Sequence, residues 1–376
     1  MKDVAYHRFA DPELGEFAGE VDHTDPFSQE PTGTYEAASW TSPVVRTGFT
    51  VGEIVPTWDA DTPDGSWLQV EAALVLADGG RSGWYVLARW TSAEGGLCRT
   101  TVPGQKDGHA EVHTDVLAVS DRVRAVGWQL RAVALRPLGS TATPRLRSLG
   151  AMASAHPHGP VEPSDRVGEG SHILDVPAYS QQRHRGEHPE WDNGGASWCS
   201  ATSVAMVLDH WKAGPDEAET AWVEPGNVHP QVVHAVRAVY DHAYDGAGNW
   251  AFNTAYAGQR GLRGFVTRLR GLDEAELFTA AGIPLVASVS FTREELDGAG
   301  YDTRGHLLVI VGFDERGDVV VNDPASHELP DDDEVRTTYD RTQFEQAWGR
   351  SGGLVYVIHP EDTPLPPHPR PDQPSW

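Results

Sequence analysis

A stretch with little apolar content divides the sequence into two halves of different character. Residues 153–171 read ASAHPHGPVEPSDRVGEGS, and this mixture of proline, glycine and serine is typical of a linker. Short strand patterns precede it, whereas helical patterns and then strands follow it. Because 376 residues exceed the ~100–200 of a usual domain, we expect two domains. We place them at residues 1–155 and 172–360, with a linker at 156–171 and a proline-rich tail at 361–376.

The first half shows the alternation of an all-β domain. Every second residue from Leu68 to Leu76 is apolar, as in a strand with one buried face. Residues 84–90 and 126–135 show similar patterns, and clusters rich in glycine and aspartate lie between the strands. Short strands at this spacing predict a β-sandwich or jelly roll.

The acidic cluster DADTPDG at residues 59–65 matches a calcium-binding loop only in part. Such a loop needs oxygen ligands at its first, third and fifth positions and glycine at its sixth. Here Pro63 takes the fifth position and Gly65 comes one residue late, so an acidic turn is the better interpretation. The neighbouring Trp58 and Trp67 leave two roles open: glycan binding through exposed rings, or packing that shapes one wall of a cleft.

Charge and cysteine content exclude several classes of protein. A formal net charge of −26 repels phosphate backbones and anionic lipids, so we expect neither nucleic acid nor a membrane as partner. With only Cys98 and Cys199, the fold does not depend on a disulfide framework or a paired-cysteine zinc site. His184 and His188 lie in a glycine-containing loop without a third ligand, so we expect no metal there.

The beginning of the sequence bears on the compartment. The residues MKDVAYHRFADPELGEF contain no apolar stretch of signal-peptide length, and no segment approaches the ~18 apolar residues of a membrane span. As written, the sequence predicts a cytoplasmic protein. A truncated start would be compatible with secretion, so the compartment stays open.

Cys199 lies where a helix is expected to begin. Apolar residues recur at the spacing of one helix face from Val204 to Trp211, and Ser197 is a candidate N-cap. The partial positive charge of a helix N-terminus stabilises a thiolate, which is the nucleophilic form of cysteine. The alternative is a buried structural cysteine, since free cysteine is among the most buried residue types.

A histidine and an aspartate follow in a pattern that suits a cysteine nucleophile. His306 begins the apolar run 307–311, and the turn GFDERGD leads into a second strand at 319–321, followed by Asp323. Two antiparallel strands joined in this way place His306 and Asp323 at the same end of the sheet. A thiolate needs a base that also protonates the leaving group, and that base is usually a histidine held by a third group.

An oxyanion donor is the remaining requirement of such a site. The segment DVPAYSQQ precedes the cysteine and ends in Gln181 and Gln182, only one of which can point inward if the segment is extended. A side-chain amide from here would act together with the backbone N–H of Cys199 on the tetrahedral oxygen.

These four segments together resemble a known family. The pattern VPAYSQ…WCSATSVAMVL…GHLLVIVGF…VVVNDP is similar to papain-like cysteine peptidases related to the double-glycine-leader peptidases, in particular an actinobacterial group with a β-rich N-terminal domain. The resemblance covers most of residues 172–360. It implies that Cys199 is the nucleophile, His306 the base, Asp323 the orienting acid and Gln181 the oxyanion donor. The fold implied is an N-terminal all-β sandwich or jelly roll followed by an α+β papain-like cysteine peptidase domain.

The sequence departs from the family pattern at two places. Ser200 stands where the family usually has glycine after the cysteine, and the segment between Gln181 and Cys199 is longer than in the leader peptidases. No transporter segments follow, so the leader-processing role is not carried over.

Aromatic and polar residues near the cysteine are candidates for the substrate cleft. Residues 246–261 lack a helical period and suggest a loop, which would either line the cleft or pack against the cysteine helix. Residues 273–291 instead predict a helix that leads into a strand. Tyr301 and Asp302 are candidates for a flap. The substrate-binding candidates are Trp191, Trp198, Trp250 and Asn253.

The sequence therefore predicts amide hydrolysis of a peptide or cell-wall-type substrate without metal or organic cofactor. Two other hypotheses about the function stay open. One is a catalytically silent scaffold that binds peptide or glycan. The other is a cell-wall amidase or an acyltransferase that uses the same thiol.

Overall fold

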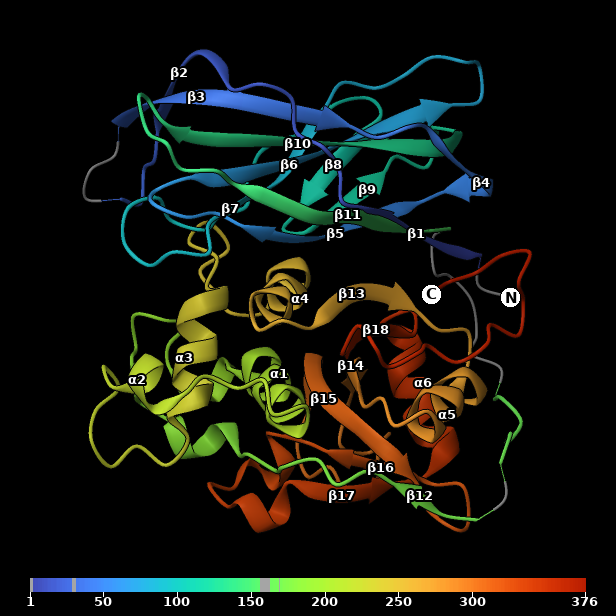
Figure 1. The fold of residues 1–376 in the computed structure, drawn as a ribbon. Coiled ribbons are helices and arrows are strands. Elements are labelled where there is room, and N and C mark those ends of the chain that lie inside the picture. Colours follow the sequence, from blue (N-terminus) through green and yellow to red (C-terminus); the bar gives the residue numbers. More distant parts are fainter. Residues whose placement is uncertain (1–2, 29–31, 156–162, 169) are drawn as a thin grey trace. The chain divides into compact units, whose positions relative to one another are not determined.

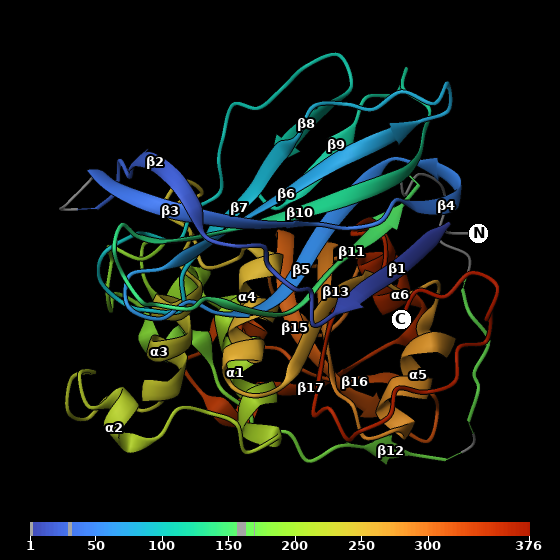
Figure 2. The same cartoon turned by 45° about the horizontal axis from the view of Figure 1, so that its top comes forward.

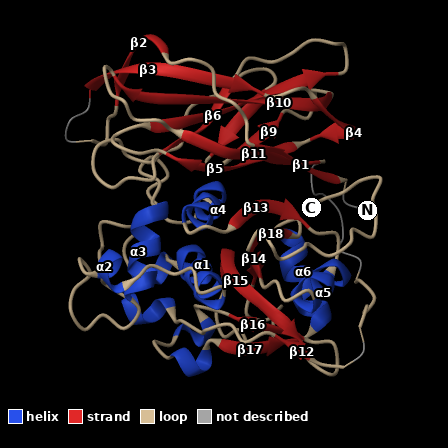
Figure 3. Ribbon diagram, viewed as in Figure 1, coloured by secondary structure: helices blue, strands red, loops and turns tan. Residues whose placement is uncertain are grey.

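The computed structural model describes residues 3–28, 32–155, 163–168 and 170–376 (Figure 1). Its contacts divide the chain into two units, and each is described by itself. One unit contains the strands β1 to β11, the short segment Tyr240–Asp245 and Trp376. The other contains the remaining elements, from β12 to β18 with the helices between them. Figure 3 shows the first unit as strands and loops and the second as a mixture of helices and strands.

The described strands of the first unit form two antiparallel sheets. The first sheet has the order β1 (Val4–Ala10), β11 (Arg145–Ser154), β5 (Glu53–Asp61), β9 (Val116–Val119), β8 (Ala110–His113). The second has the order β2 (Ala18–Thr24), β3 (Thr32–Thr41), β10 (Ala125–Pro137), β6 (Trp67–Leu76), β7 (Tyr85–Trp90), with β4 (Val45–Val51) also paired to β10. The prediction of a β-rich N-terminal domain is confirmed.

Trp58, Trp67, Trp90 and Trp128 of this unit are buried, whereas Trp40 and Trp84 are half-buried. Trp58 and Trp67 are only 1% and 2% exposed, and Trp58 packs edge-on against Trp90 with ring centroids 5.8 Å apart. The expectation that Trp58 and Trp67 present exposed rings to a glycan is therefore wrong. Trp58 lies on β5 and meets Trp90 of the other sheet, whereas Trp67 lies on β6 and packs against the rings of Tyr35 and His23 of its own sheet. In both places burial of the aromatic ring stabilises the fold.

The acidic cluster at residues 59–65 is partly strand rather than turn. Asp59 and Asp61 lie at the end of β5, and both pair with Arg147 of β11, which is opposite in the sheet. The carboxylates are neutralised by this guanidinium across the two strands.

The second unit is built on one antiparallel sheet. Its order is β13 (Arg263–Arg268), β18 (Leu354–His359), β14 (Leu285–Phe291), β15 (Thr303–Phe313), β16 (Val319–Asn322), β17 (Arg336–Tyr339), with β12 (His172–Ile173) also paired to β15. The expected hairpin of two strands around GFDERGD is the β15–β16 pair, in which Val309 lies opposite Asn322.

Helices cover this sheet on both sides. Within the unit, α1 (Cys199–His210), α3 (Pro230–Val239) and α4 (Trp250–Gln259) lie on one side of β14 and β15 (Figures 1 and 2). On the other side lie α5 (Leu272–Ala280) and α6 (Arg341–Arg350). The short helix α2 (Glu217–Thr220) packs on α3. The predicted helix-to-strand unit at 273–291 is confirmed as α5 followed by β14.

Helix α1 is buried on all sides rather than amphipathic. Every residue from Ser200 to Leu208 is buried, because α1 packs between the helices α3 and α4 and the strands β14 and β15. The expectation that only one apolar face of this helix is buried is wrong, because serine, threonine and alanine residues are buried on its other faces. Its N-cap position is taken by Trp198, so the expected Ser197 cap is also wrong.

Residues 250–259 form helix α4, where a loop was expected. Asn249 is the N-cap, and its side chain accepts a hydrogen bond of 3.0 Å from the backbone N–H of Phe252. Ala251 to Gly258 are all buried. A helix buried all round has no polar face, so its period does not show in the sequence.

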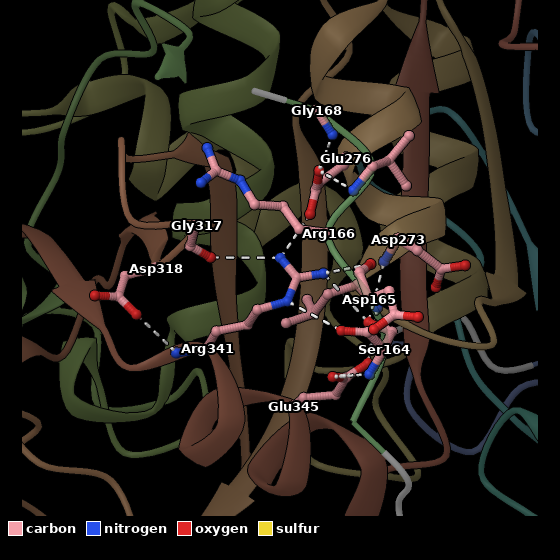
Figure 4. A network of polar contacts seen from close by, with 12 residues as sticks. Ser164, Asp165, Arg166, Gly168, Asp273, Glu276, Gly317, Asp318, Arg341 and Glu345 are labelled. Carbon is pink, nitrogen blue, oxygen red and sulfur yellow. Dashed lines mark hydrogen bonds and ion pairs between the residues drawn. The ribbon is translucent and has the colours of Figure 1, made fainter. Parts of the chain in front are cut away.

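The segment near the start of the second unit is bound to helices α5 and α6. Of the expected linker, residues 156–162 and 169 lie outside the described residues. The backbone N–H of Ser164 donates to Glu345 at 2.8 Å, and those of Val167 and Gly168 donate to Glu276 at 3.0 and 3.1 Å (Figure 4). We call residues 163–168 the strap.

The end of the chain is also held by hydrogen bonds. Arg270 donates to the carbonyl of Gln373 at 2.8 Å and to the hydroxyl of Ser375 at 3.1 Å. In the part of the chain that the structure describes, no helix has the length and apolar character needed to cross a membrane.

Candidate active site

Cys199 is the first residue of α1 and is partly exposed. Two glycines allow the chain to reach this position. Gly194 has a φ of +87°, and a Cβ on Gly195 would lie 2.3 Å from the backbone carbonyl carbon of His184. The 3₁₀ turn η2 (Gly195–Ser197) therefore packs directly on the turn η1 (Gln181–His184).

His306 and Asp323 form a buried pair. His306 Nε2 donates to Asp323 Oδ1 at 2.8 Å, and the two residues are 4% and 0% exposed. The Cys199 side chain lies near enough to the imidazole to raise the pKa of His306. Because Asp323 occupies Nε2, Nδ1 is the nitrogen left for the thiol. The structure thus places His306 in contact with Asp323 and near Cys199.

The electrostatics of the pair favour a charged imidazole. Burial lowers the pKa of His306, but the Asp323 carboxylate and the Cys199 side chain outweigh burial and raise that pKa to about 10. Burial raises the pKa of Asp323, but His306 and hydrogen bonds from two tyrosines bring the net pKa below its ordinary value. An imidazolium beside a thiol is the arrangement that stabilises a thiolate.

Two tyrosines contact Asp323, and the sequence does not predict either contact. The hydroxyls of Tyr301 and Tyr339 each donate to Asp323 Oδ2 at 2.8 Å. Tyr301 is buried, so the expectation that it lies on a flap is wrong, whereas Asp302 is exposed and pairs with Arg293. No sequence pattern links Tyr339 to Asp323, since the contact depends on how the segment after β16 folds back.

Gln181 lies in η1 with its side chain buried. Its Nε2 donates to the carbonyl of Ala196 at 2.5 Å, and its backbone N–H donates to the carbonyl of Pro324 at 2.9 Å. Its Oε1 is buried without a hydrogen-bond partner among the described residues. An extended segment was expected here, in which Gln181 and Gln182 would point to opposite sides. Both residues lie instead in a 3₁₀ turn, and the side chain of Gln182 accepts a hydrogen bond from Arg185.

Ser200, the residue that departs from the family pattern, is accommodated inside the fold. Its hydroxyl lies 3.0 Å from the hydroxyl of Tyr356 on β18, and both residues are buried. The serine therefore contacts the sheet rather than solvent.

The four substrate-binding candidates divide into two groups. Trp198 is fully buried and its indole N–H donates to the carbonyl of Trp191 at 2.9 Å. Asn253 is buried too, and its amide donates to the carbonyls of Ala247 and Asn249. Neither side chain can contact a substrate, because neither reaches the surface. Trp191 and Trp250 are partly exposed.

The histidines considered for metal binding have other partners. His184 Nδ1 lies 2.8 Å from Glu187, and His188 Nδ1 lies 3.1 Å from Glu190. Among the residues that the structure describes, no group of three histidine, cysteine, aspartate or glutamate side chains is placed to hold a metal ion.

Two family models match the chain. The model described as Peptidase_C39 like family matches residues 173–356, and the model described as Peptidase C39 N-terminal domain, in its actinobacterial form, matches residues 5–154. The first match contains Cys199, His306, Asp323 and Gln181. No curated protein matches the chain.

Several solved structures share a weak likeness. A structure of the infectious bursal disease virus Gx strain is 13% identical to this chain and has a TM-score of 0.20. The match covers 41% of this chain and 32% of the viral chain. A Podospora anserina GH26-CBM35 β-(1,4)-mannanase has 9% identity, coverages of 56% and 48%, and a TM-score of 0.17. The family 22 carbohydrate binding module of Clostridium thermocellum Xyn10B has 11% identity, coverages of 41% and 85%, and a TM-score of 0.14. The chain spans about a third of the length of the viral structures, and TM-scores this low support no conclusion.

Proposed function

Because the chain belongs to the peptidase C39-like family in its actinobacterial form, we propose that it is a papain-like cysteine peptidase with Cys199 as nucleophile. The observation that carries the proposal is the buried hydrogen-bonded pair of His306 and Asp323, near which the Cys199 side chain contributes to raising the pKa of the imidazole. A nucleophile, a base and an orienting acid in this order are the requirements of covalent amide hydrolysis.

The proposed reaction has two stages. In the first, the Cys199 thiolate attacks the amide carbonyl carbon, and the tetrahedral intermediate collapses as the C–N bond breaks. The His306 imidazolium gives its proton to the leaving amine, and a thioester remains on the sulfur. In the second, neutral His306 takes a proton from water, whose oxygen attacks the thioester and releases the acid and the thiolate. Asp323 holds Nε2–H of His306 throughout, so that Nδ1 carries the proton that moves.

Gln181 and the backbone N–H of Cys199 are the proposed oxyanion donors. Nε2 of Gln181 carries two hydrogens, and one is engaged by Ala196, three residues before the nucleophile. The second hydrogen is the one proposed to stabilise the oxyanion. Such a donor contributes ~3–4 kcal/mol in enzymes where it has been removed.

The proposed substrate is an amide of a peptide or of a cell-wall polymer, and the proposed chemistry uses side chains alone. Of the cleft candidates, Trp191 and Trp250 stay as proposals. The jelly-roll connectivity and a glycan partner are also proposals for the first unit, although not through Trp58 or Trp67. The net charge of −26 argues against nucleic acid and anionic membranes as partners.

Alkylation of the protein by iodoacetamide across pH 4–9.5, followed by mass mapping of the modified cysteine, tests the proposal. Cys98 is an internal control, because burial and the nearby Asp25 raise the pKa of its thiol to about 11. We expect Cys199 to react at pH 6 at least tenfold faster than an ordinary thiol, and His306→Ala to abolish this excess. A rate at Cys199 no higher than that of a free thiol would instead favour the catalytically silent binding scaffold.

A further inference from the structure

The carboxylate of Asp323 is held on both of its oxygens. Oδ1 accepts from His306 at 2.8 Å and from the backbone N–H of Ala325 at 3.0 Å. Oδ2 accepts from the hydroxyls of Tyr301 and Tyr339, both at 2.8 Å. One oxygen therefore faces the imidazole, and the other faces two neutral donors.

The two phenols come from different parts of the sheet. Tyr301 lies just before β15, the strand of His306, and Tyr339 is the last residue of β17. A rotation of the carboxylate about its Cβ–Cγ bond breaks hydrogen bonds to both. Because hydrogen bonds to an ionised acceptor are stronger than neutral ones, this pair of donors fixes the plane of the carboxylate.

Tyr301 also shields the pair from water. Its ring packs edge-on against the His306 ring, with centroids 5.5 Å apart and an interplanar angle of 80°, and against Phe291 at 5.2 Å. The charged side chains therefore interact in a poorly solvated environment, where each hydrogen bond has a larger effect.

We propose that Tyr301 and Tyr339 are positioning residues of the active site, which hold the Asp323 carboxylate with Oδ1 directed at His306. This inference rests on the proposed function of Cys199 and His306. The phenols do not touch the substrate. They act through Asp323, and they let a buried carboxylate stay ionised at pH values where it would otherwise take up a proton.

The positioning role of the two tyrosines predicts a change in how the reaction rate of Cys199 depends on pH. The titratable groups that face Asp323 are His306, Tyr301 and Tyr339, with Cys199 beyond the imidazole. Removal of a phenol hydroxyl raises the pKa of Asp323, because the ionised form loses a donor. As the pH is lowered, the variant then loses its pair of thiolate and imidazolium at a higher pH than the parent does. The rate of reaction at Cys199 near pH 8 is nearly preserved.

The test uses Cys98→Ser protein as the parent, so that one thiol remains, and the variants Tyr301→Phe, Tyr339→Phe and the double variant. The rate of iodoacetamide reaction at Cys199 is measured by intact mass from pH 4 to pH 9. We expect the acid limb of the profile to move up by about one pH unit in each single variant and by about two in the double variant. The plateau rate near pH 8 changes by less than about threefold.

Tyr256→Phe is the matched control. Tyr256 is also buried in the second unit, but its hydroxyl hydrogen-bonds His234 at 2.9 Å, so its removal leaves the acid limb in place. Circular dichroism verifies that each variant folds. If the double variant does not fold, the two single variants decide the question.

The two proposals fail in different ways. An activated parent whose acid limb is unchanged in both tyrosine variants, or whose rate falls equally at all pH values, overturns the positioning role alone. A parent that reacts no faster than a free thiol overturns the function of Cys199 and the positioning role with it.

Discussion

At the scale of single residues, the site depends on where charge is buried. Asp323 is fully buried, yet it accepts four hydrogen bonds, and these compensate for the solvation that it lacks. The sequence predicts Cys199, His306 and Asp323 because the proposed thiol chemistry constrains their types. It does not predict Tyr301 or Tyr339, because any buried donor at the right place would serve Asp323.

Asp323→Asn is expected to slow the reaction of Cys199 with iodoacetamide at pH 6 by at least tenfold. The substitution removes the charge that raises the pKa of His306, so the imidazolium and its thiolate partner are lost at lower pH. Near pH 9.5 the difference is expected to shrink, because an imidazolium is no longer needed for thiolate formation at a pH above the usual range of thiols. Asp302→Asn, at an exposed carboxylate next to Tyr301, serves as the control. An equal loss at both pH values would contradict this account.

At the scale of elements, the site is assembled where turns meet. The β15–β16 hairpin follows from the sequence, because a run of apolar residues, a turn and a second run leave little choice of pairing. Helix α4 and the turn at Gln181 do not follow. The first is buried on all sides and shows no period, and the second is shaped by contacts with Ala196 and Pro324, which are distant in sequence.

Gly195→Ala is expected to lower the free energy of unfolding by ~1–3 kcal/mol, the usual range for overpacking. The added Cβ would lie 2.3 Å from the His184 carbonyl carbon, so η1 and η2 must separate. Urea unfolding followed by tryptophan fluorescence measures the loss. Gly83→Ala, where a Cβ meets nothing within 4 Å, is the control and is expected to change stability little. Equal stability of the two variants would show that the turns separate without cost.

Arg341→Met is expected to lower the free energy of unfolding by ~2–4 kcal/mol, because it removes one partner of a nearly buried pair. Arg341 donates to Glu276 at 2.6 Å and to the strap at the carbonyl of Asp165, as Figure 4 shows. The loss of these bonds also frees the strap, which we expect limited proteolysis to cut sooner. Arg350→Met, at a half-exposed pair with Glu295, is the control and is expected to have little effect. Comparable losses in both variants would argue against the strap as an anchored element.

At the scale of the whole molecule, acidic residues exceed basic ones by a wide margin, 55 against 29. Like charges repel in the folded state, so specific pairs such as His306 with Asp323 stabilise the protein against a background of general repulsion. The sequence predicts the two-part organisation and the β-rich first half, because composition changes along the chain. It does not show which tryptophans are buried, since burial is a property of the finished sheets.

The stability contributed by His306 is expected to depend on pH with a definite sign. Its folded pKa is about 10, above the ordinary value of 6.5, so its contribution is complete below pH 6.5 and is lost as the pH rises toward 10. The difference in urea midpoint between the wild type and His306→Gln should therefore be larger at pH 6 than at pH 10. His113→Gln, at a mostly exposed side chain, is the control. A difference that grows with pH would show that His306 is held neutral.

Helix α1 has one further consequence. From Ser200 to Leu208 it is buried throughout, so Cys199 stands at the end of a helix that belongs to the interior of its domain. Any substitution along this helix then changes packing and reactivity together, and a mutational scan would find almost no position that alters one alone. Substitutions in the segment between Gln181 and Cys199, where Asn193, Ala196 and Ser197 are exposed, are expected to disturb the packing of α1 less.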